Sequence, residues 1–166
     1  MNEAYSEWLV KRKPPVYAIA VKAVMIVLCI FSVFLALTTV LGVIALLVVG
    51  GISYFVFQNM NLEYEYLYVN GELDVDKIMS KTKRKRVASI EMEKVELVAP
   101  LKSHELDYYR NNKGIKIVDY SSGEEDHDIY AIILNGEKGM QMIYFEPNNI
   151  ILKDMRRIAP RKVKTM

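Results

Sequence analysis

The longest pattern in the chain is an apolar stretch from about Val16 to Phe57, within which Lys22 is the only charged residue. The stretch is about twice the ~20 apolar residues that one helical crossing of a bilayer needs. It also exceeds the ~7–15-residue apolar core of a signal peptide. We therefore predict a transmembrane helical hairpin over residues 16–58, with spans at about Val16–Leu37 and Val40–Phe57. The turn falls at Leu37–Gly42, where threonine can cap a helix start and glycine eases a sharp turn.

Basic residues flank this stretch on both sides, whereas the turn within it carries none. They are Lys11, Arg12 and Lys13 before it, and Lys77, Lys81, Lys83, Arg84, Lys85 and Arg86 after it. The positive-inside rule then places both termini in the cytoplasm, so residues 1–15 form a cytoplasmic N-terminal segment. Aromatic residues at the two ends agree with one common interface: Trp8, Tyr17, Tyr54, Phe55 and Phe57.

Small and weakly polar residues share one face of each predicted span, at alternating steps of four and three. The first face carries Ala18, Lys22, Met25, Cys29, Ser32 and Ala36, and the second carries Gly42, Ala45, Val49 and Ser53. Small faces let membrane helices approach closely, so we expect the spans to pack along them. Lys22 either extends its ammonium to the nearby interface or is a functional intramembrane charge. Cys29 is the only cysteine, which rules out a disulfide within one chain and indicates a packing residue.

From Asn61 onward, short segments of alternating polarity replace the apolar run and predict strands. Leu62–Val69 is followed by Asn70-Gly71, the strongest short hairpin signal, and by a second strand around Leu73 and Val75. Further strands are predicted at Arg84–Ile90, Gly114–Tyr120, Ile129–Leu134 and Met140–Phe145, with turns at 80–83 and 135–139 and an acidic loop at 121–128. The types of Glu93–Val98 and His104–Asn111 stay open.

The C-terminal tail changes period. Ile151, Met155 and Ile158 recur at steps of four and three after Pro147-Asn148-Asn149, which predicts a helix that Pro160 ends. Residues 61–166 thus form an α+β domain of six or seven strands in antiparallel hairpins, a small curved sheet or barrel, followed by one helix. A domain of this size is expected to fold without the membrane hairpin.

The order of these parts resembles bacterial two-pass membrane proteins that carry a pleckstrin-homology-like (PH-like) domain. The resemblance rests on Tyr64–Val75 directly after the membrane segment, on the basic strand Lys83–Ile90, and on Phe145-Glu146-Pro147 leading into a helix that Pro160-Arg161-Lys162-Val163 follows. It covers essentially the whole chain. It implies a PH-like fold and a place in the bacterial plasma membrane, and it implies no particular activity, because a fold does not supply one.

The densest charge in the chain is Lys81-Thr82-Lys83-Arg84-Lys85-Arg86, on a predicted turn and strand start. Such a cluster can bind anionic lipid headgroups at roughly 1 kcal/mol per charge near the surface. The alternative is a solvated edge strand that sets topology and blocks aggregation. Binding of nucleic acid is not expected, because acidic residues are interspersed and no nucleic-acid motif is present.

Candidate catalytic and metal-binding groups are few. Glu124-Glu125-Asp126-His127-Asp128 lacks the spacing and the glycine of a calcium loop, and His104-Glu105 is followed by Tyr108 where a zinc protease has histidine. With two histidines and one cysteine in the apolar run, a nucleophile and base are hard to pair. We expect no catalytic residue, metal or cofactor. Two functions stay open: a membrane-tethered module that binds a lipid headgroup or a protein, and an accessory subunit whose helical hairpin is the interface.

Overall fold

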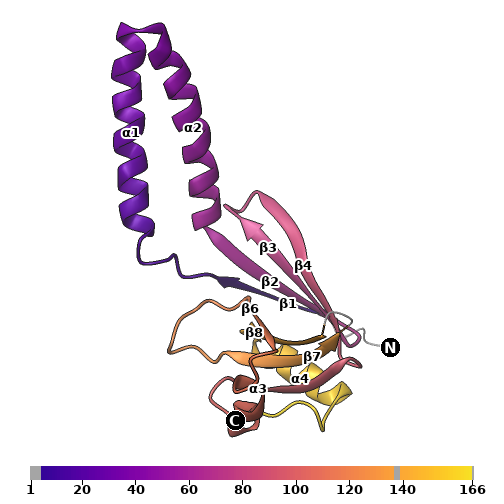
Figure 1. Ribbon diagram of the computed structural model, residues 1–166. Helices are drawn as coiled ribbons and strands as arrows, with labels where there is room; N and C mark the ends of the chain where they lie inside the picture. The colour runs from indigo at the N-terminus through magenta and orange to yellow at the C-terminus, as the bar shows by residue number, and fades with distance from the viewer. Residues whose placement is uncertain (1–4, 137–138, 166) are drawn as a thin grey trace. The chain divides into compact units, whose positions relative to one another are not determined.

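A computed structural model describes residues 5–136 and 139–165 of the chain (Figure 1). The chain divides into two compact units. One, the helical unit, comprises residues 14–62 and 79–83, and the other, the sheet unit, comprises residues 1–13, 63–78 and 84–166. Each unit is described by itself below.

The helical unit is an antiparallel hairpin of α1 (Ala18–Thr38) and α2 (Val40–Met60). Thr39 separates the helices, and its hydroxyl accepts a hydrogen bond from the backbone N–H of Gly42 at 3.1 Å, which is the expected capping of a helix start. Both helices are long and apolar enough to cross a membrane, and only 11% of the most apolar window of each is buried. A core helix of a soluble protein would be mostly buried, which these two helices are not. The two-helix hairpin and its turn are confirmed, and the crossing of a membrane by these helices stays a prediction.

The first sheet contains four strands in the order β1-β2-β3-β4. Their bounds are Tyr5–Lys11 (β1), Leu62–Val69 (β2), Glu72–Met79 (β3) and Lys83–Glu91 (β4). The hairpin at Asn70-Gly71 is confirmed, because both residues have positive φ, 49° and 95°, as a tight hairpin turn requires.

Strand β1 is not predicted by the sequence pattern, which gives the N-terminal segment no secondary structure. It pairs antiparallel with β2 from Tyr5 opposite Val69 to Lys11 opposite Glu63. The helical hairpin is therefore the connection between two neighbouring strands of one sheet. An isolated fragment 61–166 would lack the first strand of that sheet.

The second sheet also contains four strands, in the order β5-β7-β8-β6. Their bounds are Val95–Pro100 (β5), Lys116–Asp119 (β6), Tyr130–Gly136 (β7) and Gly139–Phe145 (β8). The expectation of antiparallel hairpins throughout is wrong for β6, which pairs parallel with β8. The loop after β6 carries the chain to β7, so β6 cannot form a hairpin with β8 and lies beside it at the sheet edge. The count of six or seven strands in residues 61–166 is confirmed, because β2 to β8 are seven, and the additional strand β1 lies in the N-terminal segment. The centre of the predicted β7–β8 turn, residues 137–138, lies outside the described residues.

Between the sheet strands lie the short helices η1 (His104–Leu106) and α3 (Asp107–Arg110), which settle the undecided segment there. The C-terminal helix α4 spans Asn149–Ile158, and the side-chain oxygen of Asn148 accepts from the N–H of Ile151 at 2.8 Å. Both the helix and its asparagine cap are confirmed.

The main core lies between the inner faces of the two sheets and α4. It contains Val10, Tyr64, Tyr66, Tyr68, Leu73, Val75, Ile90, Val98, Ile132, Phe145, Ile151 and Met155. A second cluster includes Leu106, Ile115 and Ile133, on the other face of the second sheet. Because the second sheet is buried on both faces, residues 130–133 are all buried, which explains their uninterrupted apolar run.

Candidate functional site

The basic cluster occupies the β3–β4 turn and the first half of β4. Ser80 and Lys81 both adopt positive φ, 48° and 60°, which costs roughly 1 kcal/mol or more for residues with a Cβ. The backbone N–H of Ser80 donates to the carbonyl of Asn61 at 2.9 Å, which fixes the turn beside the end of α2. Backbone strain of this kind is common at functional sites, so the strained turn supports the choice of this cluster as a candidate site.

The two arginines of the cluster are already paired with carboxylates of the same sheet. Arg84 Nη2 lies 2.7 Å from the Glu65 carboxylate, whose side chain is only 5% exposed. Arg86 bridges two carboxylates of β3, Asp74 at 2.8 Å and Asp76 at 3.2 Å. Burial raises the pKa of the Glu65 carboxyl, and the positive charge of Arg84 opposes that rise. These arginines therefore stabilise the outer face of the sheet, and little of their charge is left for a ligand.

Lys81, Lys83 and Lys85 are the members of the cluster whose charge is available. All three are exposed, and no ion pair to them is found within the described ranges. Strands joined by turns this short run antiparallel, so the end of β3 and the start of β4 lie at the same end of the sheet as the end of β1 and the start of β2. The helical hairpin is covalently attached at that end, which is also the end that carries the three lysines.

Two of the basic residues before the hairpin, Arg12 and Lys13, are paired with acidic side chains of the sheet unit. Arg12 Nη2 lies 3.2 Å from Asp119 Oδ2, and its guanidinium stands 5.8 Å from the centre of the Tyr64 ring. Lys13 Nζ lies 2.8 Å from Glu124, and the Lys13 N–H donates to the carbonyl of Ser122 at 2.8 Å. These contacts fasten the segment that leads into α1 to the loop after β6.

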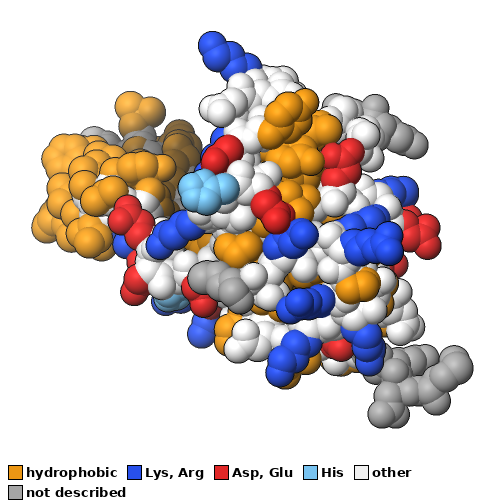
Figure 2. Space-filling view, turned by 90° about the horizontal axis from the view of Figure 1, so that it is seen from below, with side chains coloured by type: hydrophobic (Ala, Val, Ile, Leu, Met, Phe, Trp, Pro, Cys, Tyr) orange, Lys and Arg blue, Asp and Glu red, His pale blue; other side chains and the backbone are white. Residues whose placement is uncertain are grey.

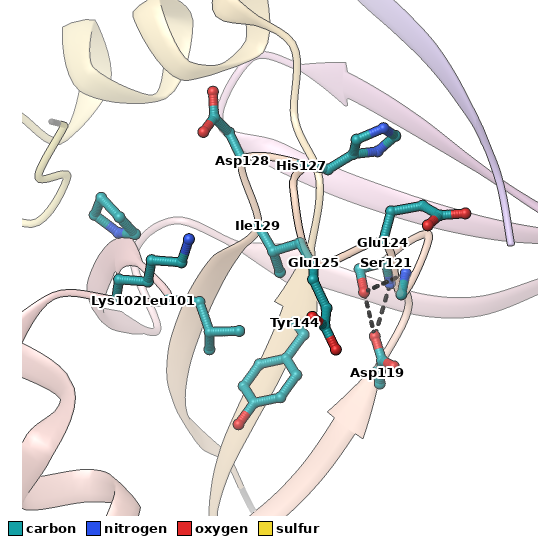
Figure 3. A pocket seen from close by; sticks show the side chains of 12 residues that line it. Leu101, Lys102, Asp119, Ser121, Glu124, Glu125, His127, Asp128, Ile129 and Tyr144 are labelled. Atoms are coloured by element: carbon teal, nitrogen blue, oxygen red, sulfur yellow. Dashed lines mark hydrogen bonds between the residues drawn. The ribbon is translucent and has the colours of Figure 1, made fainter. Parts of the chain in front are cut away.

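That loop carries the acidic run 124–128 and borders a cavity of about 500 Å³ (Figure 3). Asp119, Glu124, Glu125 and Asp128 contribute carboxylates, and Leu101, Ile129 and Tyr144 contribute apolar surface. In Figure 3, Asp119 accepts hydrogen bonds from Ser121, which fold the loop back on the end of β6. No group of three potential metal ligands comes together among the described residues.

His127 fastens the other end of the same loop. Its Nδ1 lies 2.7 Å from Glu146 Oε1 and 3.2 Å from Ser122 Oγ. The Tyr66 hydroxyl donates to the carbonyl of Tyr120 at 2.7 Å and accepts from the N–H of Glu146 at 3.2 Å, and burial raises the pKa of this hydroxyl. Because these contacts hold the loop at both of its ends, the loop is a structural element of the sheet unit.

The predicted packing faces of the two helices contain the least exposed residues of the hairpin. In α1 these are Ala18, Lys22, Met25, Cys29, Ser32 and Ala36, joined by Val21, and in α2 they include Gly42, Ala45, Val49 and Ser53. Cys29 Sγ lies 3.3 Å from Ser53 Oγ, so these two side chains meet across the hairpin. A Cβ on Gly42 would overlap the backbone of Leu35 and Ala36, so only glycine fits at this crossing.

Comparison with known proteins agrees with this architecture. The sequence matches, over residues 2–165, the family described as "Bacterial PH-like domain (DUF6106)". No curated protein sequence matches it significantly. The match includes β1, both apolar helices and the whole of the sheet unit, so the pairing of β1 with β2 belongs to the matched region. The chain is a member of this family of bacterial PH-like domains.

Proposed function

We propose that this protein is a non-enzymatic, membrane-anchored binding module of the bacterial plasma membrane, with both termini and the PH-like domain in the cytoplasm. Lys81, Lys83 and Lys85 contact anionic lipid headgroups in this proposal. The observation that supports it best is the division of the basic cluster: the two arginines are paired within the sheet, whereas the three lysines are exposed without a carboxylate partner among the described residues.

The attachment of the hairpin makes weak headgroup contacts useful. Each lysine near an anionic surface contributes roughly 1 kcal/mol, which is too little to recruit a soluble protein. Here the helices already hold the domain at the bilayer, so the same contacts become intramolecular and act by orienting it. A binding surface elsewhere on the PH-like domain would thereby be presented to the cytoplasm in a fixed direction.

The test is the reactivity of individual lysine amines in the full chain, reconstituted into nanodiscs. Acylation followed by mass spectrometry should show Lys81, Lys83 and Lys85 protected in discs that contain phosphatidylglycerol and reactive in discs of phosphatidylcholine. Added salt should remove the protection, because screening shortens electrostatic reach to ~8 Å at physiological strength.

Exposed lysines elsewhere in the sheet unit provide the internal control. Lys113, Lys116 and Lys153 are exposed, and their reactivity should not depend on lipid charge. Equal reactivity of the three turn lysines in both kinds of disc would refute the headgroup contact. Changing Lys83, Arg84, Lys85 and Arg86 together would be a poor test, because it also breaks the ion pairs to Glu65, Asp74 and Asp76.

A second function, an accessory subunit of a larger membrane assembly, is supported by a specific feature of α2. Added Cβ atoms at Gly50 and Gly51 would meet nothing within 4 Å, and small residues are where a partner helix can approach closely. Gly50→Leu and Gly51→Leu would block such a partner while leaving the lysine reactivity unchanged. Loss of a co-purifying membrane protein from these variants would favour this function over the first.

A further inference from the structure

A second concentration of positive charge lies in the sheet unit, away from the β3–β4 turn in sequence. It borders a hollow of about 540 Å³ whose walls come from three elements: the loop after β5, the C-terminal half of α4 and the segment that follows α4. The lining residues are Pro100, Lys102, Ser103, Glu105, Arg156, Pro160, Val163, Lys164 and Thr165. Figure 2 views the chain from below, and Lys and Arg side chains gather over part of that face.

Among the described residues, the charged side chains around the hollow are those of Lys102, Arg156, Lys164 and Glu105. Glu105 offsets only part of the positive charge, because its carboxylate lies 3.7 Å from Lys164 Nζ and both side chains are 46% exposed. Ser103 and Thr165 add hydroxyl groups to the same walls. Two net positive charges together with hydroxyl donors favour an anion with several oxygen acceptors.

The backbone around the hollow is fixed before any ligand arrives. Val163 pairs with Val98 of β5, the Val98 N–H donates to the carbonyl of Lys162 at 2.8 Å, and the Lys164 N–H donates to the carbonyl of Val98 at 2.8 Å. Arg156 Nη1 donates to Thr165 Oγ1 at 3.0 Å, which positions the guanidinium at the edge of the hollow. Groups held in place by the fold lose less conformational entropy on binding.

We propose that this hollow binds a phosphate group, with Arg156 as the main contact and Lys102 and Lys164 as supporting charges. Guanidinium presents two parallel donors to phosphate oxygens, which is why arginine suits this role better than a point charge does. The site goes beyond the headgroup contact proposed above, since it uses none of Lys81, Lys83 and Lys85. The phosphate can belong to a soluble molecule or to a phospholipid.

The first experiment measures pyrophosphate binding to the full chain in a neutral detergent, by calorimetry at constant ionic strength maintained with sodium chloride. Saturable binding is expected, together with protection of Lys102 and Lys164 from acylation. Arg156→Gln should weaken the affinity about tenfold, as expected for loss of a charged hydrogen-bonding group. Arg157→Gln is the matched control, because Arg157 lies next to Arg156 on α4, pairs with Asp154 at 3.6 Å and does not line the hollow.

Glu105→Gln supplies a test that misfolding cannot imitate. Removing the Glu105 carboxylate, which lines the hollow beside the lysines, should tighten pyrophosphate binding by a few fold. No saturable binding, equal losses in Arg156→Gln and Arg157→Gln, or weaker binding by Glu105→Gln would each overturn the proposal.

The source of the phosphate is decided in nanodiscs without added pyrophosphate. Protection of Lys102 and Lys164 in discs that contain phosphatidylglycerol, and not in discs of phosphatidylcholine, identifies an anionic phospholipid. Reactivity in both discs, combined with protection by pyrophosphate, identifies a soluble ligand. Because Lys81→Gln, Lys83→Gln and Lys85→Gln should leave pyrophosphate affinity unchanged, failure of the headgroup contact and failure of this site are separate outcomes.

Discussion

Lys11 of β1 lies directly opposite Glu63 of β2 in the first sheet, although the whole helical hairpin separates them in the chain. The sheet unit therefore has two covalent links to the hairpin, one on each of two adjacent strands. Val10, next to Lys11, is buried in the main core, so the strand before the hairpin contributes to the stability of the domain after it.

The first prediction is that the hairpin can be replaced by a short loop. Deleting residues 14–61 and joining Lys13 to Leu62 through four or so Gly and Ser residues should give a soluble, cooperatively folding domain, because antiparallel neighbours need only a short connection. Circular dichroism with a thermal melt measures the outcome.

The comparison fragment is residues 61–166, which lacks β1. It loses the burial of Val10, worth about 1.5 kcal/mol or more, together with the β1–β2 backbone pairing and the contacts of Arg12 with Asp119. We expect a melting temperature at least several degrees lower, or no cooperative transition. A fragment as stable as the joined domain would show that β1 is dispensable.

A second prediction concerns topology. Since β1 and β2 pair in one sheet, a chain that crosses a membrane with α1 and α2 must return to the side from which it entered. A phosphatase that is active only outside the cytoplasm should be silent when fused before Met1 or after Met166, and active when inserted at Thr39. Activity at one terminus alone would imply an odd number of crossings and contradict the paired strands.

Much of this fold can be predicted from local signals. The alternating tyrosines predict strand β2, and Asn70-Gly71 predicts the turn that follows it. Asn148 likewise predicts the start of α4. Strand β1 escapes such reasoning because its partner lies beyond the hairpin, and its apolar residues include the adjacent Trp8, Leu9 and Val10, which obscure the alternation. The parallel pairing of β6 likewise depends on a strand order that no local pattern encodes.

The candidate sites divide in the same way. Period-two alternation in β4 puts Arg84 and Arg86 on one face, and the acidic positions of β3 alternate in the same manner, so the pairs of Arg86 with Asp74 and Asp76 could have been anticipated from the β3–β4 hairpin. The pair of Arg84 with Glu65 could not, because Glu65 lies on β2, beyond β3 in the sheet. The hollow around Arg156 could not, because it requires the segment after α4 to fold back on β5. Long-range contacts of this kind leave no periodic signal in the sequence.

A third prediction tests the crossing of the two helices with matched glycine substitutions. Gly42→Ala should destabilise the hairpin by about 1–3 kcal/mol, because the new methyl group would overlap the backbone of Leu35. Gly51→Ala adds the same methyl group where nothing lies within 4 Å, and it should leave stability unchanged or raise it slightly. The measurement is the loss of helical circular dichroism as the denaturing detergent sodium dodecyl sulfate is added. Equal behaviour of the two variants would contradict the close approach at Gly42.

The last prediction concerns the Glu65–Arg84 pair and its dependence on pH. Burial raises the pKa of Glu65, and the positive charge of Arg84 opposes that rise. The neighbouring acidic groups Glu7 and Asp76 raise the pKa of Glu65 as well. Arg84→Gln should therefore raise the Glu65 pKa further above its ordinary value of about 4.5. A carboxyl whose pKa is higher in the folded state contributes its stability below the unfolded pKa and loses it as the pH rises through the folded pKa.

The thermal midpoint of the full chain in a neutral detergent, recorded from pH 4 to pH 8, tests this sign. The free energy of unfolding that Arg84→Gln loses relative to the parent, derived from the shift in midpoint, should be small near pH 4 and grow to about 1–2 kcal/mol at neutral pH. The expected loss is no larger because the Arg84 side chain is 54% exposed and solvent screens its charge. Arg110→Gln removes an arginine from an exposed pair with Asp107 and should cost less than about 0.5 kcal/mol with little pH dependence. A deficit for Arg84→Gln that is constant with pH would mean that Glu65 keeps its charge without help from Arg84. The ion pair would then be a surface contact of the ordinary kind, despite the burial of its carboxylate.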